Sequence, residues 1–487
     1  MMTSDRGHTP VRPGGVGRRD FVRIGSAGLM AAATADHLRP FETRAQADVT
    51  PLNTADACIF IKLAGAMSHM DTFSVKVGAW TPAGFAVQTR GGITLSNRLF
   101  PRLLQQTNKF SIIHSVQGWV PVHQIGQYWV DTAQDFNAAL ANERPALGAV
   151  VAMEYQGQRR PGVDVMPGFV SLIASPQVGN GFLNGLVAPF PVAGGAPQGT
   201  GRLIGAAGLG GLTHPRGQGA FDRYYERLQE MDAENRSGNP PWGKPLADYN
   251  DYFVAAKGLM YNETVTPIFQ YGDAERALYG GTVFGDSMLV ARNLVAANLG
   301  TKFVHVTFTG WDMHQNIYST AAGAASLINR GPVLDAGLAQ LLVDLSNMPS
   351  PTREGKTLLE TTLIVMMGEF GRTPPNRYGP TGLNAGNGRD HYANVQFAVV
   401  AGGGTRAGRN IGRTDSFGSA ITDPGWDSGG RPLPAGPNVR MEDLGATIYS
   451  ALNINWTKEI FETPSRRVYQ YISGGPNTYY KPINELF

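Results

Sequence analysis

Three short motifs in this chain place a histidine within two residues of an aspartate. They are Ser68-His69-Met70-Asp71, Asp312-Met313-His314 and Asp390-His391. Imidazole nitrogen binds Zn, Fe, Ni or Cu, whereas carboxylate oxygen suits Mg, Ca or Mn. The residue types therefore predict a site for one or two divalent metal ions, and they leave open whether the ion is Zn, Ca, Mg or Mn.

Six residues of these motifs and of the segment Gly368-Glu369-Phe370 are the candidate metal ligands. They are Asp71, Asp312, His314, Glu369, Asp390 and His391. A single Asp-His pair is more often a surface hydrogen bond than a site. Several acidic clusters that all follow predicted strands favour metal binding over that interpretation.

Three further residues are candidates for a catalytic role. His123 either assists proton transfer or binds the metal. Arg372 and Arg389 flank the acidic motifs. Their guanidinium groups either grip a phosphate or sulfate in bidentate fashion, or neutralise Glu369 and Asp390 as structural partners.

The elements that must position these groups follow from the hydrophobic pattern. Short apolar, β-branched runs, each followed by a polar or glycine-rich turn, predict buried parallel strands. These runs are residues 58–64, 110–116, 168–174, 303–309, 362–367 and 397–401. Helical patterns lie between them at residues 99–107, 124–140, 285–299, 333–348 and 441–452. The alternation predicts an α/β fold with a doubly wound, mostly parallel sheet flanked by helices, whose carboxyl edge gathers the candidate ligands.

Composition and charge narrow the classes of protein. The 487 residues include 62 Gly and 32 Pro but only 16% charged residues, which indicates a folded body with long loops rather than a coiled coil or a disordered chain. The net charge is +3, and residues 1–47 carry seven Arg against four acids. The remainder is formally neutral, so nothing in its charge predicts binding to nucleic acid or an anionic membrane.

The amino terminus resembles a twin-arginine export signal. Arg18-Arg19 precede an uncharged run at residues 24–35, and Ala45-Gln46-Ala47 fits a small-residue cleavage site. The alternative is an amphipathic or disordered basic tail. The run is shorter than the roughly 20 residues that span a bilayer, and no later apolar run is long enough either, so we expect no transmembrane segment in the mature protein. Its localisation would be periplasmic or secreted, with the twin-arginine export machinery as a partner.

The domain prediction follows from these boundaries. Residues 1–47 form the signal peptide, and residues 48–487 form one α/β domain. A Gly/Pro-rich and then helical insertion interrupts this domain at about residues 175–299. The single cysteine, Cys58, lies in a predicted strand and is expected to be a small core residue.

The motifs together resemble the exported bacterial family named domain of unknown function 1501. The resemblance is carried by residues 59–73, Val283-Phe284-Gly285-Asp286, Gly310-Trp311-Asp312-Met313-His314, Gly368-Glu369-Phe370-Gly371-Arg372-Thr373-Pro374 and Gly388-Arg389-Asp390-His391. That family is similar to the alkaline phosphatase and sulfatase superfamily, which implies an alkaline phosphatase-like sandwich with metal at the strand ends. By this likeness Asp71 is the acid after the first strand, and Asp312 and His314 are the middle acid and histidine. Glu369 is then the acid after the next strand, and Asp390 and His391 form the late pair.

The chain departs from the superfamily pattern at two places. Glu369-Phe370 stands where an Asp-His pair is usual, and residues 120–126 contain His123 but no hydroxyl or thiol nucleophile. A metal-bound water is then at least as plausible a nucleophile as a side chain. The sequence predicts an exported metal-dependent hydrolase of phosphate or sulfate esters, acting on a small-molecule or polysaccharide substrate. The alternative is a non-catalytic exported binding protein that keeps the fold.

Overall fold

An eight-stranded sheet forms the centre of the computed structural model, which describes residues 43–487 apart from 204–212, 232–243, 434 and 474–478. In spatial order its strands are β13 (Asn410–Ile411), β5 (Phe110–Val116), β12 (Gln396–Gly402), β9 (Thr362–Met367), β2 (Ala57–Leu63), β8 (Phe303–Phe308), β6 (Phe169–Ile173) and β7 (Phe190–Ala193). Only β12 runs antiparallel to its neighbours, β5 and β9. The mostly parallel sheet predicted from the apolar runs is confirmed, and each of the six predicted strands is present to within one residue at either end.

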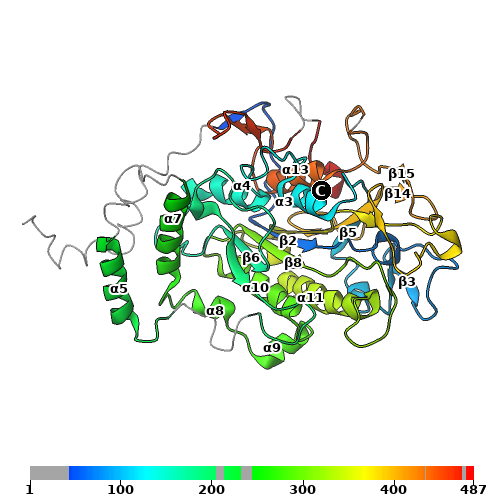
Figure 1. Cartoon of the computed structure of the whole chain (residues 1–487), viewed down its shortest axis with the longest axis horizontal. Coiled ribbons are helices and arrows are strands. Elements are labelled where there is room, and N and C mark those ends of the chain that lie inside the picture. The colour runs from blue at the N-terminus through cyan, green and yellow to red at the C-terminus, as the bar shows by residue number, and fades with distance from the viewer. Residues whose placement is uncertain (1–42, 204–212, 232–243, 434, 474–478) are drawn as a thin grey trace, which may run out of the picture. The chain divides into compact units, whose positions relative to one another are not determined.

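Helices cover both faces of this sheet (Figure 1). Alternate residues of β2 face opposite sides: Ile59 and Ile61 join the cluster beneath α10 (Val283–Ala297) and α11 (Leu327–Asn347). Cys58 and Phe60 join the cluster beneath α3 (His123–Thr132), α4 (Leu147–Glu154) and α13 (Met441–Ala451). The doubly wound arrangement is therefore confirmed, with Cys58 fully buried as expected.

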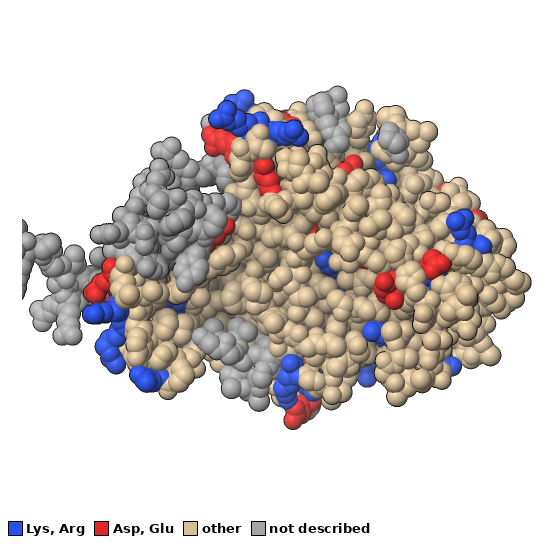
Figure 2. Space-filling view, in the orientation of Figure 1, with Lys and Arg blue, Asp and Glu red and all other residues tan. Residues whose placement is uncertain are grey.

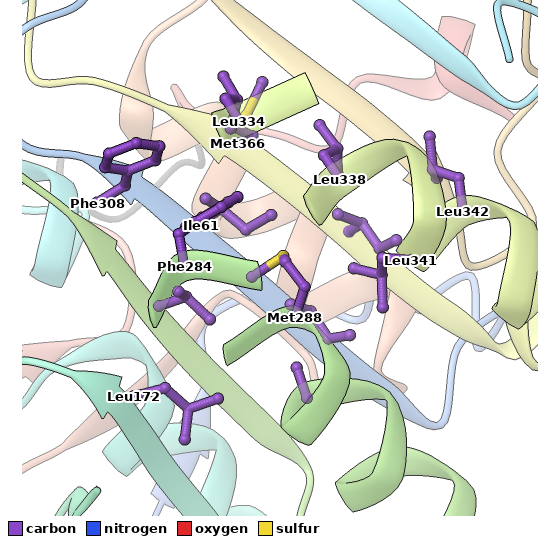
Figure 3. Close-up of a cluster of buried hydrophobic side chains, with 14 of the residues drawn as sticks. Ile61, Leu172, Phe284, Met288, Phe308, Leu334, Leu338, Leu341, Leu342 and Met366 are labelled. Carbon is purple, nitrogen blue, oxygen red and sulfur yellow. The ribbon is translucent and has the colours of Figure 1, made fainter. Parts of the chain in front are cut away.

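The α10–α11 face shows how the core holds the strands together. Figure 3 shows Phe284 and Met288 of α10 and Leu338 and Leu341 of α11 gathered over the sheet around Ile61. All of these side chains are at most 2% exposed. Burial of each large apolar side chain contributes about 1.5–3 kcal/mol to folding, so these layers hold the strand ends in register.

Local signals set the limits of the helices. The side chains of Thr282 and Ser326 cap α10 and α11 by accepting hydrogen bonds from backbone amides of their first turns. The helix expected at residues 124–140 ends at Thr132, because Ala133 adopts a left-handed conformation with φ 52°. The prediction of a helix at residues 99–107 is wrong, because only the short 3-10 helix η2 (Leu103–Gln105) forms there.

The remaining elements lie around this core. The strands are β1 (Thr43–Ala45), β3 (Val87–Arg90), β4 (Ile93–Ser96), β10 (Gly371–Arg372), β11 (His391–Tyr392), β14 (Arg413–Thr414), β15 (Ile421–Asp423), β16 (Lys458–Ile460) and β17 (Tyr469–Gln470). The α-helices are α5 (Gln218–Met231), α7 (Lys244–Leu259), α8 (Thr266–Phe269), α9 (Asp273–Leu278) and α12 (Leu358–Thr361). The 3-10 helices are η1 (His69–Asp71), η3 (Gln156–Gln158), η4 (Gly185–Val187), η5 (Gly379–Thr381) and η6 (Asn484–Leu486).

The segments predicted as leader and insertion have distinct places. Residues 1–42, with Arg18 and Arg19, lie outside the described residues. Residues 43–45 form β1, which pairs with β16. Residues 175–299 supply β7 to the edge of the main sheet and α10 to its face. None of the helices in the described chain is both long and apolar enough to cross a membrane.

Charged side chains are sparse on the face of the molecule drawn in Figure 2. Figure 2 shows Lys and Arg interspersed with Asp and Glu over a face that is mostly uncharged. This distribution agrees with the low content of charged residues, 16%, in the sequence.

A buried ion pair ties α3 to the central strand β2. Lys62 and Asp131 are 2% and 3% exposed, and Lys62 Nζ lies 2.8 and 2.7 Å from the two carboxylate oxygens. Burial by itself raises the pKa of Asp131, but the attraction of Lys62 and the hydrogen bond from His305 outweigh it and hold the pKa below its usual value. The pair therefore anchors the carboxyl-terminal end of the helix that begins at His123.

Removal of one partner of this ion pair should lower the stability of the fold. Asp131→Ala leaves the Lys62 ammonium buried without its carboxylate, and we expect the free energy of unfolding to fall by about 3–5 kcal/mol. Urea denaturation measures the change. The matched control is Asp222→Ala, which removes the partner of Lys257 in a half-exposed pair at 4.0 Å and should cost less than about 1 kcal/mol. Equal effects of the two substitutions would contradict the assignment.

Candidate metal centre

The carboxyl ends of the parallel strands bring distant loops to one edge of the sheet. β2, β8 and β9 run in the same direction, so residues 64–71, 309–314 and 368–372 leave the sheet at the same edge. β12 runs the opposite way, so the segment that precedes it, with Asp390 and His391, arrives at this edge too. His123 begins α3, after β5. This topology explains why residues more than 260 positions apart meet.

Three histidines and one aspartate converge there. The four residues are His123, Asp312, His314 and His391, and one ligand atom from each lies within 4.8 Å of the others. The Oδ1 atom of Asp312 lies 2.8 Å from His314 Nε2, 3.2 Å from His123 Nε2 and 3.6 Å from His391 Nε2. The two atoms His314 Nε2 and His391 Nε2 are 3.0 Å apart.

The other ring nitrogen of each histidine is held by an acceptor. His123 Nδ1 donates to Glu369 Oε1 at 2.7 Å, and His314 Nδ1 donates to Asp390 Oδ1 at 2.8 Å. His391 Nδ1 donates to the carbonyl oxygen of Pro121 at 2.9 Å. These partners can only accept, so they place the proton on Nδ1 and leave the Nε2 lone pair directed at the cluster. Metal-binding histidines are oriented in this way.

The centre of the cluster therefore brings hydrogen-bond acceptors face to face. Three Nε2 lone pairs and a carboxylate oxygen repel one another unless positive charge lies between them. His123 Nε2 is buried and has no hydrogen-bond partner among the described residues. The donor set fits a divalent cation, which supports the expectation of a metal site.

Arg372 supplies part of the positive charge from the buried side. Its side chain is 1% exposed, and Nη2 lies 2.6 Å from Asp312 Oδ1. Burial raises the pKa of Asp312, but the hydrogen bond and charge of Arg372 outweigh it and lower that pKa to about 2. Asp312 is thus held as a carboxylate at neutral pH.

The environment moves the pKa values of two imidazoles in opposite directions. For His123, burial favours the neutral ring, but the hydrogen bond and charge of Glu369 outweigh it and raise the pKa. For His391, burial is the largest influence and lowers the pKa, and the charge of Arg372 acts in the same direction. His391 is therefore kept neutral, as a metal ligand must be.

The cluster is open on one side. The side chains of Asp312 and His314 are 44% and 41% exposed, whereas those of His391 and His123 are 26% and 19% exposed. Every described polar contact of the Asp312 carboxylate is made through Oδ1. A ligand can therefore reach the cluster from the side of Asp312 and His314.

Glu369 organises the loops behind the cluster. Its carboxylate is fully buried and accepts hydrogen bonds from the backbone amides of Gly65 and Ala66 as well as from His123. Gly65 has φ +100°, and a Cβ at this position would lie 2.5 Å from the backbone nitrogen of Asp312. Only glycine allows the β2 turn to pass so close to the loop that carries Asp312.

The structure thus divides the candidate ligands among three positions. Asp312, His314 and His391 lie in the cluster together with His123. Glu369 and Asp390 lie behind it and hold the rings of His123 and His314. Asp71 is not brought to the cluster: it pairs with Arg389 at 2.7 Å and accepts hydrogen bonds from Ser68 and Tyr318.

The two arginines have their donors engaged by the protein. Arg372 bonds to the carbonyl oxygens of Ala66, Gly65 and Arg389 in addition to Asp312, and its Nη1 lies 3.4 Å from His314 Nε2. Arg389 is fully buried and bonds to Asp71, Tyr318 and the carbonyl oxygens of Thr373 and Gly382. The carboxylates paired with Arg372 and Arg389 are thus Asp312 and Asp71, and not the expected Glu369 and Asp390.

Sequence reasoning missed the groups that position Asp390 and His391. Asp390 also accepts hydrogen bonds from Tyr378 and Asn384, and His391 donates to a proline carbonyl. A backbone carbonyl leaves no signal in the sequence. The glycine at position 388, in the segment from Asn384 to Gly388, is a signal that the sequence does contain. A Cβ at this position would lie 2.0 Å from the carbonyl carbon of His314, so glycine is required where the two loops meet.

Comparison with known proteins places the chain in a family. A family model described as "Protein of unknown function (DUF1501)" matches residues 55–469. No curated protein matches the sequence significantly. Two of the similar solved structures are Ps i-CgsB in complex with k-i-k-neocarrahexaose and the lipoteichoic acid synthase LtaP from Listeria monocytogenes.

Both structural likenesses are remote. Ps i-CgsB is 11% identical, with 82% of this chain and 72% of that chain covered and a TM-score of 0.36. LtaP is 8% identical, with 87% of this chain and 78% of that chain covered and a TM-score of 0.36. Likenesses at this level do not bear on the activity of this chain.

Loss of one cluster histidine should strongly weaken metal binding. We expect the purified protein to carry a divalent ion, and His314→Ala to weaken its affinity by more than about 100-fold, because loss of an outer partner alone costs 10–100-fold. Inductively coupled plasma mass spectrometry measures the bound metal, and thermal denaturation with and without chelator measures the stabilisation it gives. His214→Ala, outside the cluster, is the control. Unchanged affinity in His314→Ala would show that the cluster is not the metal site.

Proposed function

Since the chain belongs to the DUF1501 family of proteins of unknown function, we propose from the site itself that it is an exported, metal-dependent hydrolase of phosphate or sulfate esters. In this proposal His123, Asp312, His314 and His391 hold one divalent ion at the carboxyl edge of the sheet. Among the other candidates from the sequence, Glu369 and Asp390 orient His123 and His314 through hydrogen bonds. Asp71 and Arg389 form a structural ion pair.

The convergence of three Nε2 lone pairs on the Asp312 carboxylate carries the proposal. Nitrogen and oxygen ligands at the usual distance from Zn²⁺ lie about 3.3 Å apart when the geometry is tetrahedral. The separations of 2.8, 3.0, 3.2 and 3.6 Å between cluster atoms scatter around this value. Imidazole-rich sets favour Zn²⁺ over Mg²⁺ or Ca²⁺, so we propose zinc as the ion.

The residues of the chain have separable roles in this proposal. Glu369, Asp390 and the Pro121 carbonyl orient the three rings, and Arg372 keeps Asp312 ionised. When bound, the ion polarises an ester oxygen and lowers the pKa of a water molecule. Asp312 makes its described contacts through Oδ1, so Oδ2 would be available as a hydrogen-bond acceptor for a bound substrate. His123 binds the ion through Nε2 in this proposal, with Glu369 holding its Nδ1.

One observation favours the alternative function. Both Arg372 and Arg389 are buried, with their donors on protein acceptors, so neither guanidinium is presented to an anionic ester. A non-catalytic exported protein that uses the metal centre for binding is therefore the second candidate. The two candidates differ in turnover and not in metal content.

Export by the twin-arginine route is the second part of the proposal. It rests on Arg18-Arg19, the uncharged run at residues 24–35 and Ala45-Gln46-Ala47. We propose residues 48–487 as the mature α/β domain, with residues 175–299 as an elaboration of it. Cleavage after Ala47 would remove β1, whose backbone pairs with β16.

A substrate panel with a metal control tests the hydrolase. The zinc-loaded protein is assayed on p-nitrophenyl phosphate, bis-p-nitrophenyl phosphate and p-nitrophenyl sulfate. We expect turnover of at least one ester that is lost on chelation and restored by zinc. His391→Ala should lower kcat/KM at least about 100-fold, as loss of metal predicts, and His214→Ala should leave it unchanged. A metal-loaded protein that hydrolyses none of the three would support the binding-protein alternative.

Export assays and amino-terminal sequencing test whether residues 1–47 are a twin-arginine signal peptide. We expect Arg18→Lys with Arg19→Lys to abolish export, and amino-terminal sequencing of the exported protein to begin at Asp48. Unfolding of chains that begin at residue 43 and at residue 48 then measures the contribution of β1. Export of the double variant at the wild-type level would contradict the twin-arginine proposal.

A further inference from the structure

A cavity of about 330 Å³ opens beside the amino terminus of α13. Three aromatic side chains, Trp119, Tyr479 and Tyr480, line it together with Arg440 and Asp135. The volume lies at the lower end of the range for small-molecule sites, about 300–1,000 Å³. The cavity thus combines apolar ring faces with one donor group and one acceptor group.

Arg440 is a buried cation whose hydrogen-bonding capacity is not used up by the protein. Its side chain is 8% exposed, and Nε has no hydrogen-bond partner among the described residues. The carboxylate that comes within ion-pair distance is that of Glu442, with Oε2 3.6 Å from Nε, which is too long for a hydrogen bond. The guanidinium carbon lies 5.4 Å from the ring centroid of Trp129, which holds the group in place.

Asp135 supplies the acceptor. Its side chain is exposed at the cavity, and Arg440 is the cation that acts most strongly on it. In the described part of the chain the two side chains form no ion pair within 4.0 Å, so the guanidinium and carboxylate lie apart. With one positive and one negative group, the cavity has no net charge and suits an uncharged ligand that both donates and accepts hydrogen bonds.

One of the aromatic side chains, Tyr480, is held at the cavity by a cation–π contact. The guanidinium carbon of Arg431 lies 4.7 Å from the ring centroid of Tyr480, and Arg431 is itself paired with Asp443 at 2.7 Å. Tyr479 is 47% exposed, so its ring faces solvent at the mouth. The ring of Tyr480, fixed in this way, offers apolar surface to a ligand at little cost in conformational entropy.

The cavity lies at the same edge of the sheet as the metal centre. Val116, the last residue of β5, bridges to Val439, and Gln117 N donates to Val439 O at 2.9 Å. These contacts place Arg440 beside the segment that begins at the carboxyl end of β5. The same segment contains Trp119 of the cavity, and then Pro121 and His123 of the metal centre.

We propose that this cavity is a saccharide-binding site. A pyranose ring presents apolar C–H faces that match Trp119 and the tyrosines, and hydroxyl groups that both donate and accept. Arg440 would donate to those hydroxyls and Asp135 would accept from them. This site is separate from the metal cluster, and the proposal does not depend on hydrolase activity.

Calorimetric titration of the full-length protein with cellotetraose, galactotetraose and sodium sulfate tests this site. We expect at least one of the two oligosaccharides to bind and sulfate not to bind. Trp119→Ala and Tyr479→Ala should each weaken binding at least about tenfold, equivalent to 1.4 kcal/mol. Tyr252→Ala, which truncates a tyrosine of similar exposure (45%) on α7, is the matched control and should not change affinity. Because Tyr479 is exposed, its substitution avoids the folding cost that loss of Trp119 could bring.

The same titration distinguishes this proposal from the hydrolase. Binding that persists in His314→Ala without metal supports the cavity as the site, whether or not the protein hydrolyses esters. Binding lost in His314→Ala but retained in Tyr479→Ala would place the saccharide at the metal centre and overturn the proposal. Binding of sulfate alone would also overturn it, as would failure of both oligosaccharides to bind at about 10 mM, ten times a Kd of about 1 mM.

Discussion

The candidate metal site depends on one constraint, which is the mutual repulsion of four hydrogen-bond acceptors that face one another. Three imidazole Nε2 atoms and the Asp312 carboxylate share a space within 4.8 Å, and while the imidazoles are neutral each of the four groups presents an acceptor to the others. Arg372 offsets part of the negative charge from below, where burial strengthens its attraction to Asp312. The remaining lone pairs need a cation. The hydrogen bonds behind the cluster therefore orient the rings for an ion, and do not by themselves explain why the rings should meet.

The fold satisfies this constraint by joining strand ends through a buried carboxylate. Glu369 follows β9, accepts from the backbone amides of the turn after β2, and holds His123 at the start of α3. The antiparallel direction of β12 is equally important, because it delivers His391 to the edge where β8 delivers Asp312 and His314. An all-parallel sheet would bring the segment before β12 to the opposite edge. The one exception to parallel order is thus what completes the cluster.

The sequence predicted the sheet and three of the four cluster residues as metal ligands, and it named His123 with its role left open. Strands buried on both faces leave an unmistakable apolar, β-branched pattern, and Asp312, His314 and His391 stand in polar turns beside such strands. The roles of the acids could not be predicted, because the partner of a carboxylate is decided by tertiary contacts. Asp71 and Asp390 have similar neighbours in the sequence, yet one pairs with Arg389 and the other holds His314. The prediction of a helix at residues 99–107 was wrong for a related reason. Its leucines, Leu99, Leu103 and Leu104, are buried as a helix would bury them, but turns and one short 3-10 helix place them there.

Burial explains why some acids could become ligands and others could not. Glu369 and Asp71 are at most 3% exposed and each is surrounded by donors from the protein, so their lone pairs are already used. Asp312 is 44% exposed and makes its described contacts through one oxygen, Oδ1, so the other oxygen is not engaged by those contacts. A carboxylate can act on an incoming molecule only in the second situation. The chemistry of this edge therefore depends on Asp312, and the buried acids serve to hold the histidines that face it.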